Sequence, residues 1–314
     1  MTTKSYQIPA KVLLFGEYGI LSHYLGVAVT LPKYQYHLTI STEKLSKVPW
    51  QDESDLSQEN THKLQQFVSR IQSLYPQKEV YGLIHKPFPK DGGFGNSSAL
   101  LYAVHDFLFR ETYPDKDPLK DPLFWEGIFK ALLSVQGGGS GYDVAIQAHH
   151  CQIDRELKGK DPFLWTYTKT TSLPLVQCQG SYQVPGYLLP TGIYSSTAKA
   201  LKIFRQEKTQ DQKDFYALEQ NKLAQRFMNL WDQSLLDESQ LKILMNDSLT
   251  LAKTQGIASF LEQDKSLPFP FKTLGSGYGD MLWILTSKDD VFWKTWQGFP
   301  MGSQGFNPIS FYEG

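Results

Sequence analysis

The sequence predicts a fold of the α+β or α/β class, on two observations. Short apolar or alternating segments typical of strands are followed along the chain by segments whose apolar residues recur at helical spacing. Glycine-rich turns at 92–95 and 137–141 separate several of these segments. The 314 residues allow two modest domains, and a change in composition places the expected junction near residue 180, which gives units 1–180 and 181–314.

Strands dominate the beginning of the chain. The short apolar runs 11–15 and 26–30 are typical of buried strands, and 34–40 alternates apolar and polar residues, as a half-buried strand does. Residues 41–60 are polar and charged, so we expect a surface loop or an edge excursion there, and not a core element. A further strand is predicted at 80–85, ahead of the first glycine-rich turn.

Helices are predicted where apolar residues share one helical face. The first covers 64–74 and ends at Pro76. The second begins at the first glycine-rich turn and continues through 100–108. The third covers 123–135 and ends at three consecutive glycines.

The last third of the chain is predicted to be mainly helical. Residues 199–236 are rich in Lys, Gln, Glu and Leu and indicate one or two long helices, and 239–254 indicates another. Two short apolar runs, 186–189 and 281–286, flank this region, and the second is predicted to be a strand. The sequence His-His-Cys at 149–151 lacks the spacing of a zinc site, so we expect a partly exposed strand or helix end there.

The composition narrows the possible functions. A net charge of −1 argues against an electrostatic nucleic-acid binder, and no segment is apolar enough for a signal peptide or a membrane span. The two cysteines do not form a disulfide framework, which favours a reducing, cytoplasmic setting. We therefore expect no nucleic-acid or membrane partner, and the composition leaves both a monomer and a homodimer open.

The glycine-rich turn at 92–95 is the strongest functional signal. It leads directly into a helix, where backbone N–H groups and the helix dipole favour a phosphate group. The Lys-Ser or Lys-Thr that ends a Walker A motif is missing. A plain helix N-cap is the alternative, since Ser and Asn are favoured there. The residues predicted to hold phosphate are Gly93, Gly95, Asn96, Ser97 and Ser98.

Three segments, 8–19, 92–104 and 272–285, together resemble the three sequence motifs of the GHMP kinases, in the same order. The resemblance implies an N-terminal ATP-binding α/β domain and a C-terminal domain of helices over an antiparallel sheet. It also implies ATP and Mg²⁺ as cofactors. In this family the third motif lies close to the nucleotide phosphates, which implicates Gly275, Gly277 and Gly279.

Details of the motifs favour the mevalonate and phosphomevalonate kinase branch. Lys11 stands at the position of the first-motif lysine, which implies a role in stabilising the transferred phosphate. Gly139-Ser140-Gly141-Tyr142-Asp143 resembles the segment that carries the catalytic aspartate, which implies that role for Asp143. Phosphomevalonate kinases have Gly-Ser-Gly-Phe-Asp-Val there, so the resemblance is closest to them. Mevalonate kinases place a magnesium-binding glutamate on the preceding helix, whereas 127–142 contains no acidic residue and Glu126 is the nearest one.

The resemblance also implies a metal ligand and residues near the phosphate acceptor. The family pattern is Gly-Leu-Gly-Ser-Ser-Ala; Ser97 aligns best with its second serine and is the expected magnesium ligand, with Ser98 as the alternative. Lys199 is either a ligand of an anionic acceptor or a solvated side chain. The residues implied in acceptor binding are Glu17, Tyr18, His23, Ser140, Ser196, Thr197 and Lys199.

The expected activity is transfer of a phosphoryl group from ATP to a small acidic metabolite of the mevalonate pathway, with phosphomevalonate preferred. A phosphate acceptor is already largely ionised at neutral pH and needs no base, so Asp143 would orient Lys11 or bind magnesium. Lys11, His23, Lys199 and Lys272 are the cations available to offset the repulsion between the two anions. The alternatives are a mevalonate kinase, another GHMP small-molecule kinase, and a non-catalytic regulator of the same fold.

Overall fold

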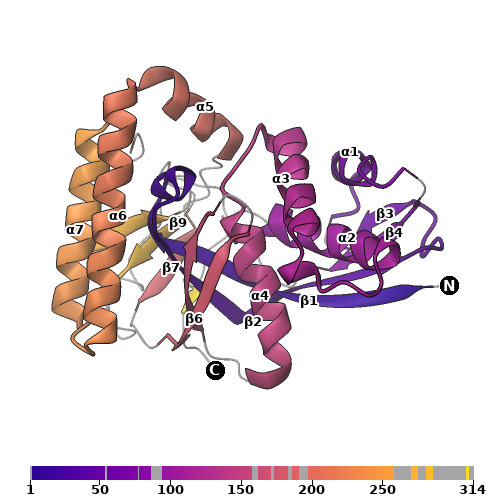
Figure 1. Cartoon of the computed structure of the whole chain (residues 1–314), viewed down its shortest axis with the longest axis horizontal. Helices are drawn as coiled ribbons and strands as arrows, with labels where there is room; N and C mark the ends of the chain where they lie inside the picture. Colours follow the sequence, from indigo (N-terminus) through magenta and orange to yellow (C-terminus); the bar gives the residue numbers. More distant parts are fainter. Residues whose placement is uncertain are drawn as a thin grey trace.

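Two β-sheets with helices packed against them make up the fold (Figure 1). This arrangement confirms the predicted α+β class. The computed structural model describes residues 2–53, 55–76, 78–85, 94–157, 162–170, 173–182, 186–190, 197–257, 270–274, 281–285 and 309–310.

The larger sheet has six strands and is centred on a long antiparallel pair, β1 (Thr3–Phe15) and β2 (Gly26–Ser41). Five of its strands follow the order β3-β4-β2-β5-β6, and β1 pairs with β2 outside this path. Strands β3 and β4 are parallel, and the other pairs are antiparallel. The remaining strands are β3 (Trp50–Asp52), β4 (Tyr81–His85), β5 (Phe163–Thr168) and β6 (Leu175–Ser181).

The predicted strands 26–30 and 34–40 are one continuous strand, β2. Its pairing with β1 shifts from Pro9 opposite Gln35 to Ala10 opposite Leu31. Pro32 lies within the extra residues and has no N–H to give to the ladder. An irregularity in the pairing therefore interrupts the alternating pattern without ending the strand.

The prediction that 41–60 contributes no core element is wrong in its second half, although β3 does lie at the edge of the sheet. Trp50 begins β3, is 2% exposed, and donates its indole N–H to the carbonyl oxygen of Val80 at 3.0 Å. Ser57 then caps α1 (Gln58–Gln72) by accepting a hydrogen bond from the backbone N–H of Asn60. One buried tryptophan thus attaches an otherwise polar segment to the sheet. The average polarity of residues 41–60 does not reveal such a single apolar contact.

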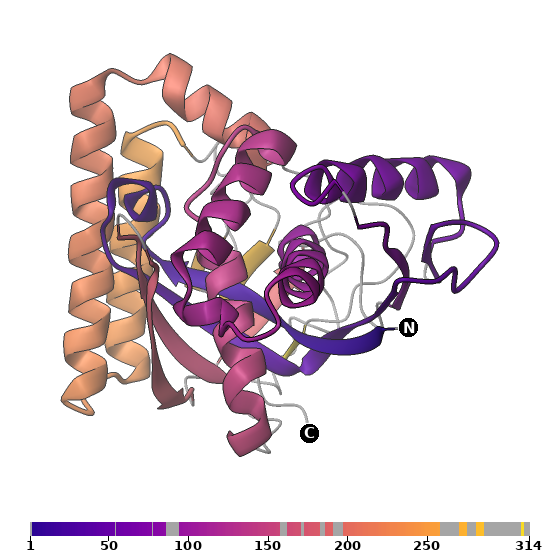
Figure 2. The ribbon, with the colours of Figure 1, turned by 45° about the vertical axis from the view of Figure 1, so that its right-hand side comes forward.

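Seven α-helices and two 3₁₀ turns lie in the described part of the chain. In Figure 1, α1 and α2 lie toward one end of the molecule and α3 and α4 nearer its middle, while α6 and α7 run side by side at the opposite end (Figures 1 and 2). Besides α1, the helices are α2 (Asn96–Thr112), α3 (Pro122–Gln136), α4 (Tyr142–Leu157), α5 (Thr197–Glu207), α6 (Gln210–Asp232) and α7 (Glu238–Thr254). The 3₁₀ turns are η1 (Gly19–Ser22) and η2 (Pro118–Lys120).

The predicted helices at 64–74, 100–108, 123–135, 199–236 and 239–254 are all confirmed. Capping explains several of their ends. Gly137 ends α3 in the left-handed conformation, and Thr209 begins α6 with a capping box to Gln212.

The expectation for 149–151 is wrong, because these residues lie in the middle of α4. No Gly or Pro occurs between Tyr142 and Leu157, so nothing ends the helix at this point. His150 is 1% exposed, and its Nδ1 lies 2.9 Å from the hydroxyl of Thr30. In the described residues, no group of three or more His, Cys, Asp or Glu side chains could hold a metal ion.

The second sheet has four antiparallel strands in the order β10-β7-β9-β8, and α7 packs against β8. The predicted strand after the third motif is confirmed as β9. The strands are β7 (Tyr187–Pro190), β8 (Phe271–Leu274), β9 (Met281–Ile284) and β10 (Ile309–Ser310).

One hydrophobic core joins the two sheets. The ring of Phe15, at the end of β1, lies 5.3 Å from that of Phe227 on α6 and 6.2 Å from that of Trp283 on β9. The chain passes from the larger sheet to the smaller one between Ser181 and Tyr187. The division into two domains near residue 180 stays a prediction. None of the described helices combines the length and apolar character needed to cross a bilayer.

Candidate active site

The glycine-rich turn, β1 and α4 meet at Gly95. This residue caps α2 with a φ of 93°, a left-handed conformation that favours glycine. A Cβ atom here would lie 2.9 Å from Cε of Lys11 and 3.0 Å from Nε2 of Gln147. The backbone N–H of Lys11 also donates to the carbonyl oxygen of Phe94 at 3.0 Å. Glycine is therefore what lets the lysine approach the start of the helix.

Lys11 and Asp143 form an ion pair, so the structure brings together the two residues predicted to be catalytic. The side chain of Lys11 is 5% exposed and that of Asp143 is 34% exposed. Burial lowers the pKa of Lys11 to about 7, while the carboxylate of Asp143 acts in the opposite direction and favours the ammonium form. The site thus holds a nearly buried cation against a carboxylate that solvent can reach.

The two serines at the start of α2 lie in different surroundings. Ser98 is buried, and its hydroxyl donates to Oε1 of Gln147 at 2.7 Å, with the carbonyl oxygen of Gly95 at 2.9 Å. Gln147 in turn donates to the carbonyl oxygen of Pro9 at 2.9 Å, which ties α2, α4 and β1 together. Ser97 is exposed and Asn96 is half-buried. Ser97 therefore offers the more accessible hydroxyl.

A hollow of about 170 Å³ lies beside these residues. No motif marks this hollow, but the stretch 41–60, the one candidate for an adenine pocket that the sequence offers, contributes Asp52 and Asn60 to its walls. Asn60 donates to the carbonyl oxygen of Asp55 at 3.0 Å, and its Nδ2 lies 3.5 Å from Oδ2 of Asp52. The cap signal at Ser57 is the feature that could have placed Asn60 on a helix facing α2. The lining residues are Tyr36, Leu38, Asp52, Asn60, Lys63, Leu64, Phe67, Ile84, Asn96, Ser97, Ala99 and Leu100.

The turn between α3 and α4 sets the position of Asp143. Gly137, Gly138 and Gly141 all have positive φ values. Ser140 is buried; its hydroxyl accepts from the backbone N–H of Tyr142 at 3.3 Å, and its carbonyl oxygen accepts from the hydroxyl of Tyr167. Within the described residues the Ser140 side chain shapes the turn that presents Asp143.

Glu17 and Tyr18 lie inside the protein. Glu17 is 3% exposed and forms an ion pair with Lys272 of β8, which is 2% exposed. Burial raises the pKa of Glu17, and the ammonium of Lys272 opposes that rise. Tyr18 has a φ of 60° and stacks on Phe204 of α5, with 4.2 Å between ring centroids. Both side chains connect the end of β1 to the C-terminal part of the chain.

Other predicted residues lie apart from Lys11 or beyond what the structure describes. His23 is exposed, and its Nδ1 lies 2.9 Å from the carbonyl oxygen of Lys169. Thr197 and Lys199 belong to the first turn of α5, for which the backbone alone is described. Residues outside the described part of the chain are Gly93, Ser196, Gly275, Gly277 and Gly279.

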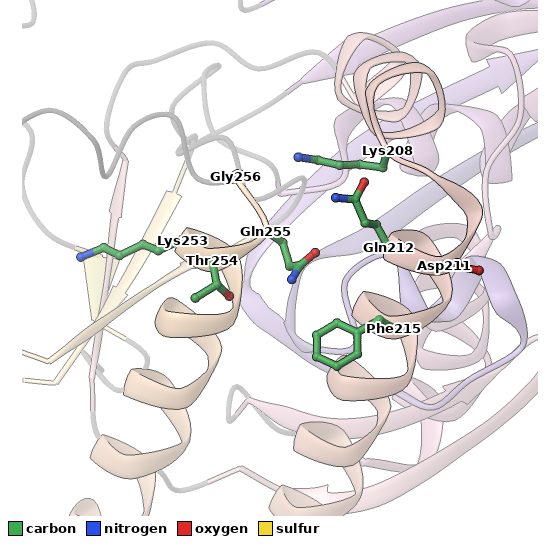
Figure 3. A pocket seen from close by; sticks show the side chains of 8 residues that line it. All are labelled: Lys208, Asp211, Gln212, Phe215, Lys253, Thr254, Gln255 and Gly256. Carbon is green, nitrogen blue, oxygen red and sulfur yellow. The ribbon is translucent and has the colours of Figure 1, made fainter.

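A second hollow of about 550 Å³ lies between the start of α6 and the end of α7 (Figure 3). None of the predicted site residues lines it. This hollow is open to solvent. It is lined by Lys208, Asp211, Gln212, Phe215, Lys253, Thr254, Gln255 and Gly256. The residues predicted to be catalytic or to bind phosphate lie around Gly95 and Lys11. We therefore place the candidate active site there and not in the hollow with the larger volume.

The chain is similar in fold to solved structures of GHMP kinases. A phosphomevalonate kinase from Streptococcus pneumoniae, in complex with phosphomevalonate and AMPPNP, has a TM-score of 0.63 at 13% identity, over 90% of this chain and 92% of that one. The mevalonate kinase of L. major, in complex with R-mevalonate, has a TM-score of 0.58 at 17% identity, over 92% and 89%. The galactokinase of Lactococcus lactis, complexed with galactose, has a TM-score of 0.61 at 12% identity, over 92% and 87%.

No protein-family model matches the chain. No curated protein matches its sequence. The structural similarities span nearly the whole chain at low identity and concern its architecture. They confirm the fold implied by the three sequence motifs: the chain has the fold of the GHMP kinases.

Proposed function

We propose that this protein is a small-molecule kinase that transfers the γ-phosphoryl group of ATP to a small acidic metabolite of the mevalonate pathway, with phosphomevalonate preferred. The observation that carries the proposal is the Lys11–Asp143 pair beside the N-terminus of α2. Phosphoryl transfer depends mainly on positioning and on stabilising negative charge. A buried ammonium next to an anion-binding helix start suits both needs.

The start of α2 is the proposed phosphate site. The first turn of α2 presents backbone N–H groups, and the helix dipole adds to their attraction for an anion. The hollow bounded by Asp52, Asn60 and Asn96 adjoins this turn and is where we place the nucleotide base. Support for ATP also comes from the S. pneumoniae neighbour, whose complex contains AMPPNP.

Magnesium fits the oxygen donors present. The exposed hydroxyl of Ser97 and the accessible carboxylate of Asp143 are the hard oxygen ligands that Mg²⁺ prefers, and we propose Ser97 as a ligand. The ion supplies partial neutralisation of the phosphate charges. Glu126 does not suit this role, because its side chain is 56% exposed on α3 and pairs with Lys130.

In the proposed reaction, an acceptor oxygen forms a bond to the γ-phosphorus while the bond from that phosphorus to the β,γ-bridging oxygen breaks, and ADP leaves. Lys11 stabilises the charge on the transferred group, and Asp143 holds Lys11 in place. A phosphate acceptor at neutral pH has already lost its proton, so no residue has to remove one. A hydroxyl acceptor would instead require Asp143 as a base.

The preference for phosphomevalonate rests on the sequence around Asp143 and on the absence of acidic residues over 127–142. Third-motif residues Gly275, Gly277 and Gly279 are proposed to lie near the nucleotide, and Ser196, Thr197 and Lys199 near the acceptor, as the resemblance implies. We further propose a cytoplasmic protein, because the two cysteines of the chain are too few for a disulfide framework.

The test is ATP consumption with Mg²⁺ and, in parallel, mevalonate, phosphomevalonate, galactose or homoserine. We expect turnover with phosphomevalonate, and a loss of at least about 100-fold in kcat for Asp143→Asn. The exposed Asp247→Asn, on α7, is the matched control and should keep full activity. Turnover with mevalonate alone would indicate a mevalonate kinase. Binding of ATP without turnover of any acceptor would contradict a kinase of this pathway and favour the regulator.

A further inference from the structure

Tyr142 contacts the proposed catalytic lysine directly, although its role is assigned by no motif. The ammonium of Lys11 donates to the hydroxyl oxygen of Tyr142 at 2.8 Å. The same ammonium lies 4.7 Å from the centroid of the ring, so the nearest part of the tyrosine is its hydroxyl. Since Asp143 follows in the sequence, two adjacent residues at the start of α4 hold one ammonium.

The position of the Tyr142 hydroxyl is fixed by its surroundings. The ring is 7% exposed and packs edge-to-face against Tyr167, with 6.2 Å between centroids. Tyr167 donates to the carbonyl oxygen of Ser140, and Ser140 accepts from the backbone N–H of Tyr142. At Gly141, which has a φ of 77°, a Cβ would lie 2.7 Å from the ring of Phe129. The turn therefore leaves the phenol little freedom to move.

The two groups that hold Lys11 differ in charge and exposure. Asp143 is an anion that is partly open to solvent, whereas Tyr142 is a buried neutral group. Burial raises the pKa of Tyr142, and the carboxylate of Glu17 raises it further, so the phenol keeps its proton. A neutral hydroxyl orients the ammonium without cancelling its charge. A second carboxylate at this position would instead reduce the positive potential that an incoming phosphate meets.

We propose that Tyr142 is a positioning residue for phosphoryl transfer: its hydroxyl fixes the direction of the Lys11 ammonium, so that the charge faces the transferred group while Asp143 holds the other side. This inference rests on the proposed function. It adds a requirement that the three motifs do not contain, because the related phosphomevalonate kinase pattern has phenylalanine at this position.

Tyr142→Phe tests the proposal, since it removes one oxygen and keeps the ring. Because the phosphomevalonate kinase pattern has phenylalanine here, we expect the variant to fold. We expect kcat to fall about 10-fold while KM for ATP stays within about two-fold, as for the loss of one hydrogen bond to a charged group in the transition state. Tyr6→Phe is the matched control: its buried hydroxyl donates to Asp106 at 2.9 Å, and the contacts of that pair involve neither Lys11 nor Asp143. A kcat for Tyr142→Phe within two-fold of the unmodified protein overturns the proposal, as does an equal loss in Tyr6→Phe.

The double variant Tyr142→Phe/Asp143→Asn separates positioning from general destabilisation. If both residues act through Lys11, the combined loss in kcat should be clearly smaller than the product of the single losses. A fully multiplicative loss would mean that Tyr142 acts independently of the Lys11–Asp143 pair.

A measurement without turnover keeps the two proposals distinguishable. If no acceptor is turned over, the proposed function fails, and the side-chain ammonium signal of Lys11 can still be followed by NMR in the full-length protein. The signal is assigned by its disappearance in Lys11→Met. We expect its exchange with water to accelerate at least several-fold in Tyr142→Phe and to stay unchanged in Tyr6→Phe. Equal exchange in the unmodified protein and in Tyr142→Phe would show that the hydroxyl does not hold Lys11.

Discussion

At the scale of single residues, two neighbouring serines in the first turn of α2 differ in burial and in the partners of their hydroxyl groups. Ser98 uses its hydroxyl within the protein, where it joins α2 to Gln147 of α4. Ser97 is exposed one residue earlier. The family pattern alone left both as candidates for the metal, whereas their burial gives them different expected roles.

The pair Ser97→Ala and Ser98→Ala provides a prediction in which each variant is the control for the other. We expect Ser98→Ala to lower the free energy of unfolding by about 1–3 kcal/mol, because it leaves the buried Gln147 oxygen without its donor, and to keep most of the activity. Ser97→Ala should leave stability within about 0.5 kcal/mol and reduce the magnesium-dependent rate at least about 10-fold. Urea unfolding and a magnesium titration of the rate measure the two effects. The reverse pattern would assign the metal to Ser98.

Features of the site that arise within one short segment could be predicted from the sequence, whereas contacts between residues far apart in the sequence could not. Gly95 and the helix after it are local features, so the turn at 92–95 sufficed to find them. The meeting of Lys11 with Asp143 came from the family resemblance, since no local pattern joins β1 to α4. The sequence did not predict the ion pair between Glu17 and Lys272, because a single glutamate or lysine is most often a charge on the protein surface. Motifs thus identify residues, and the fold decides which of them touch.

At the scale of elements, the packing of α2 against α3 depends on a buried histidine. His105 on α2 is fully buried, and its Nε2 donates to the carbonyl oxygen of Phe124 at 2.9 Å, while Tyr75 donates to Nδ1 at 3.1 Å. These partners define a neutral ring. A Cβ at Gly127 would lie 2.3 Å from Cε1 of the imidazole, so glycine on α3 makes room for it.

This histidine predicts that the protein loses stability in mild acid. Burial lowers the pKa of His105 to about 4, while its bond to Phe124 and the charge of Asp106 act in the opposite direction. Between pH 6.5 and 4 the unfolded chain binds a proton that the folded protein does not, so stability falls as the pH falls through this range. The full contribution is about 3 kcal/mol, since the folded protein binds this proton much more weakly than the unfolded chain does.

Urea unfolding at pH 7 and at pH 4.5 measures the effect. In His105→Gln the part of the pH dependence that belongs to this ring should disappear, even though the variant is less stable overall. His62→Gln, on the exposed surface of α1, is the control and should keep the full pH dependence. Equal slopes in all three proteins would show that His105 is not the group that titrates.

At the scale of the whole molecule, the end of β1 joins the two sheets. Phe15 packs against α6 and β9, Tyr18 stacks on α5, and Glu17 reaches Lys272 on β8. The ammonium of Lys272 also donates to the carbonyl oxygen of Thr273 at 3.0 Å. The chain segment that carries Lys11 is therefore anchored directly to the C-terminal sheet.

The buried Glu17–Lys272 pair predicts an asymmetric response to mutation. Lys272→Met removes the cation and leaves the carboxylate of Glu17 buried, which should cost about 3–5 kcal/mol of unfolding free energy. The double variant Glu17→Gln/Lys272→Met removes the charge as well and should recover a clear part of that loss, since breaking one partner costs more than replacing both. Two additive losses would mean that the residues do not stabilise one another.

The pH dependence of Lys272→Met provides a separate check, with a sign that follows from burial. Burial raises the pKa of Glu17, and the lysine that opposes this rise is gone in the variant. The folded variant then holds a proton that the unfolded chain releases, so its stability is greatest below the ordinary pKa of glutamate and falls as the pH rises through the raised value. We expect the deficit relative to the unmodified protein to be larger at pH 8 than at pH 5, and to depend little on pH in the double variant. A deficit that shrinks as the pH rises would show that the carboxylate of Glu17 finds another partner once Lys272 is removed, and that the ion pair is not what joins β1 to the second sheet.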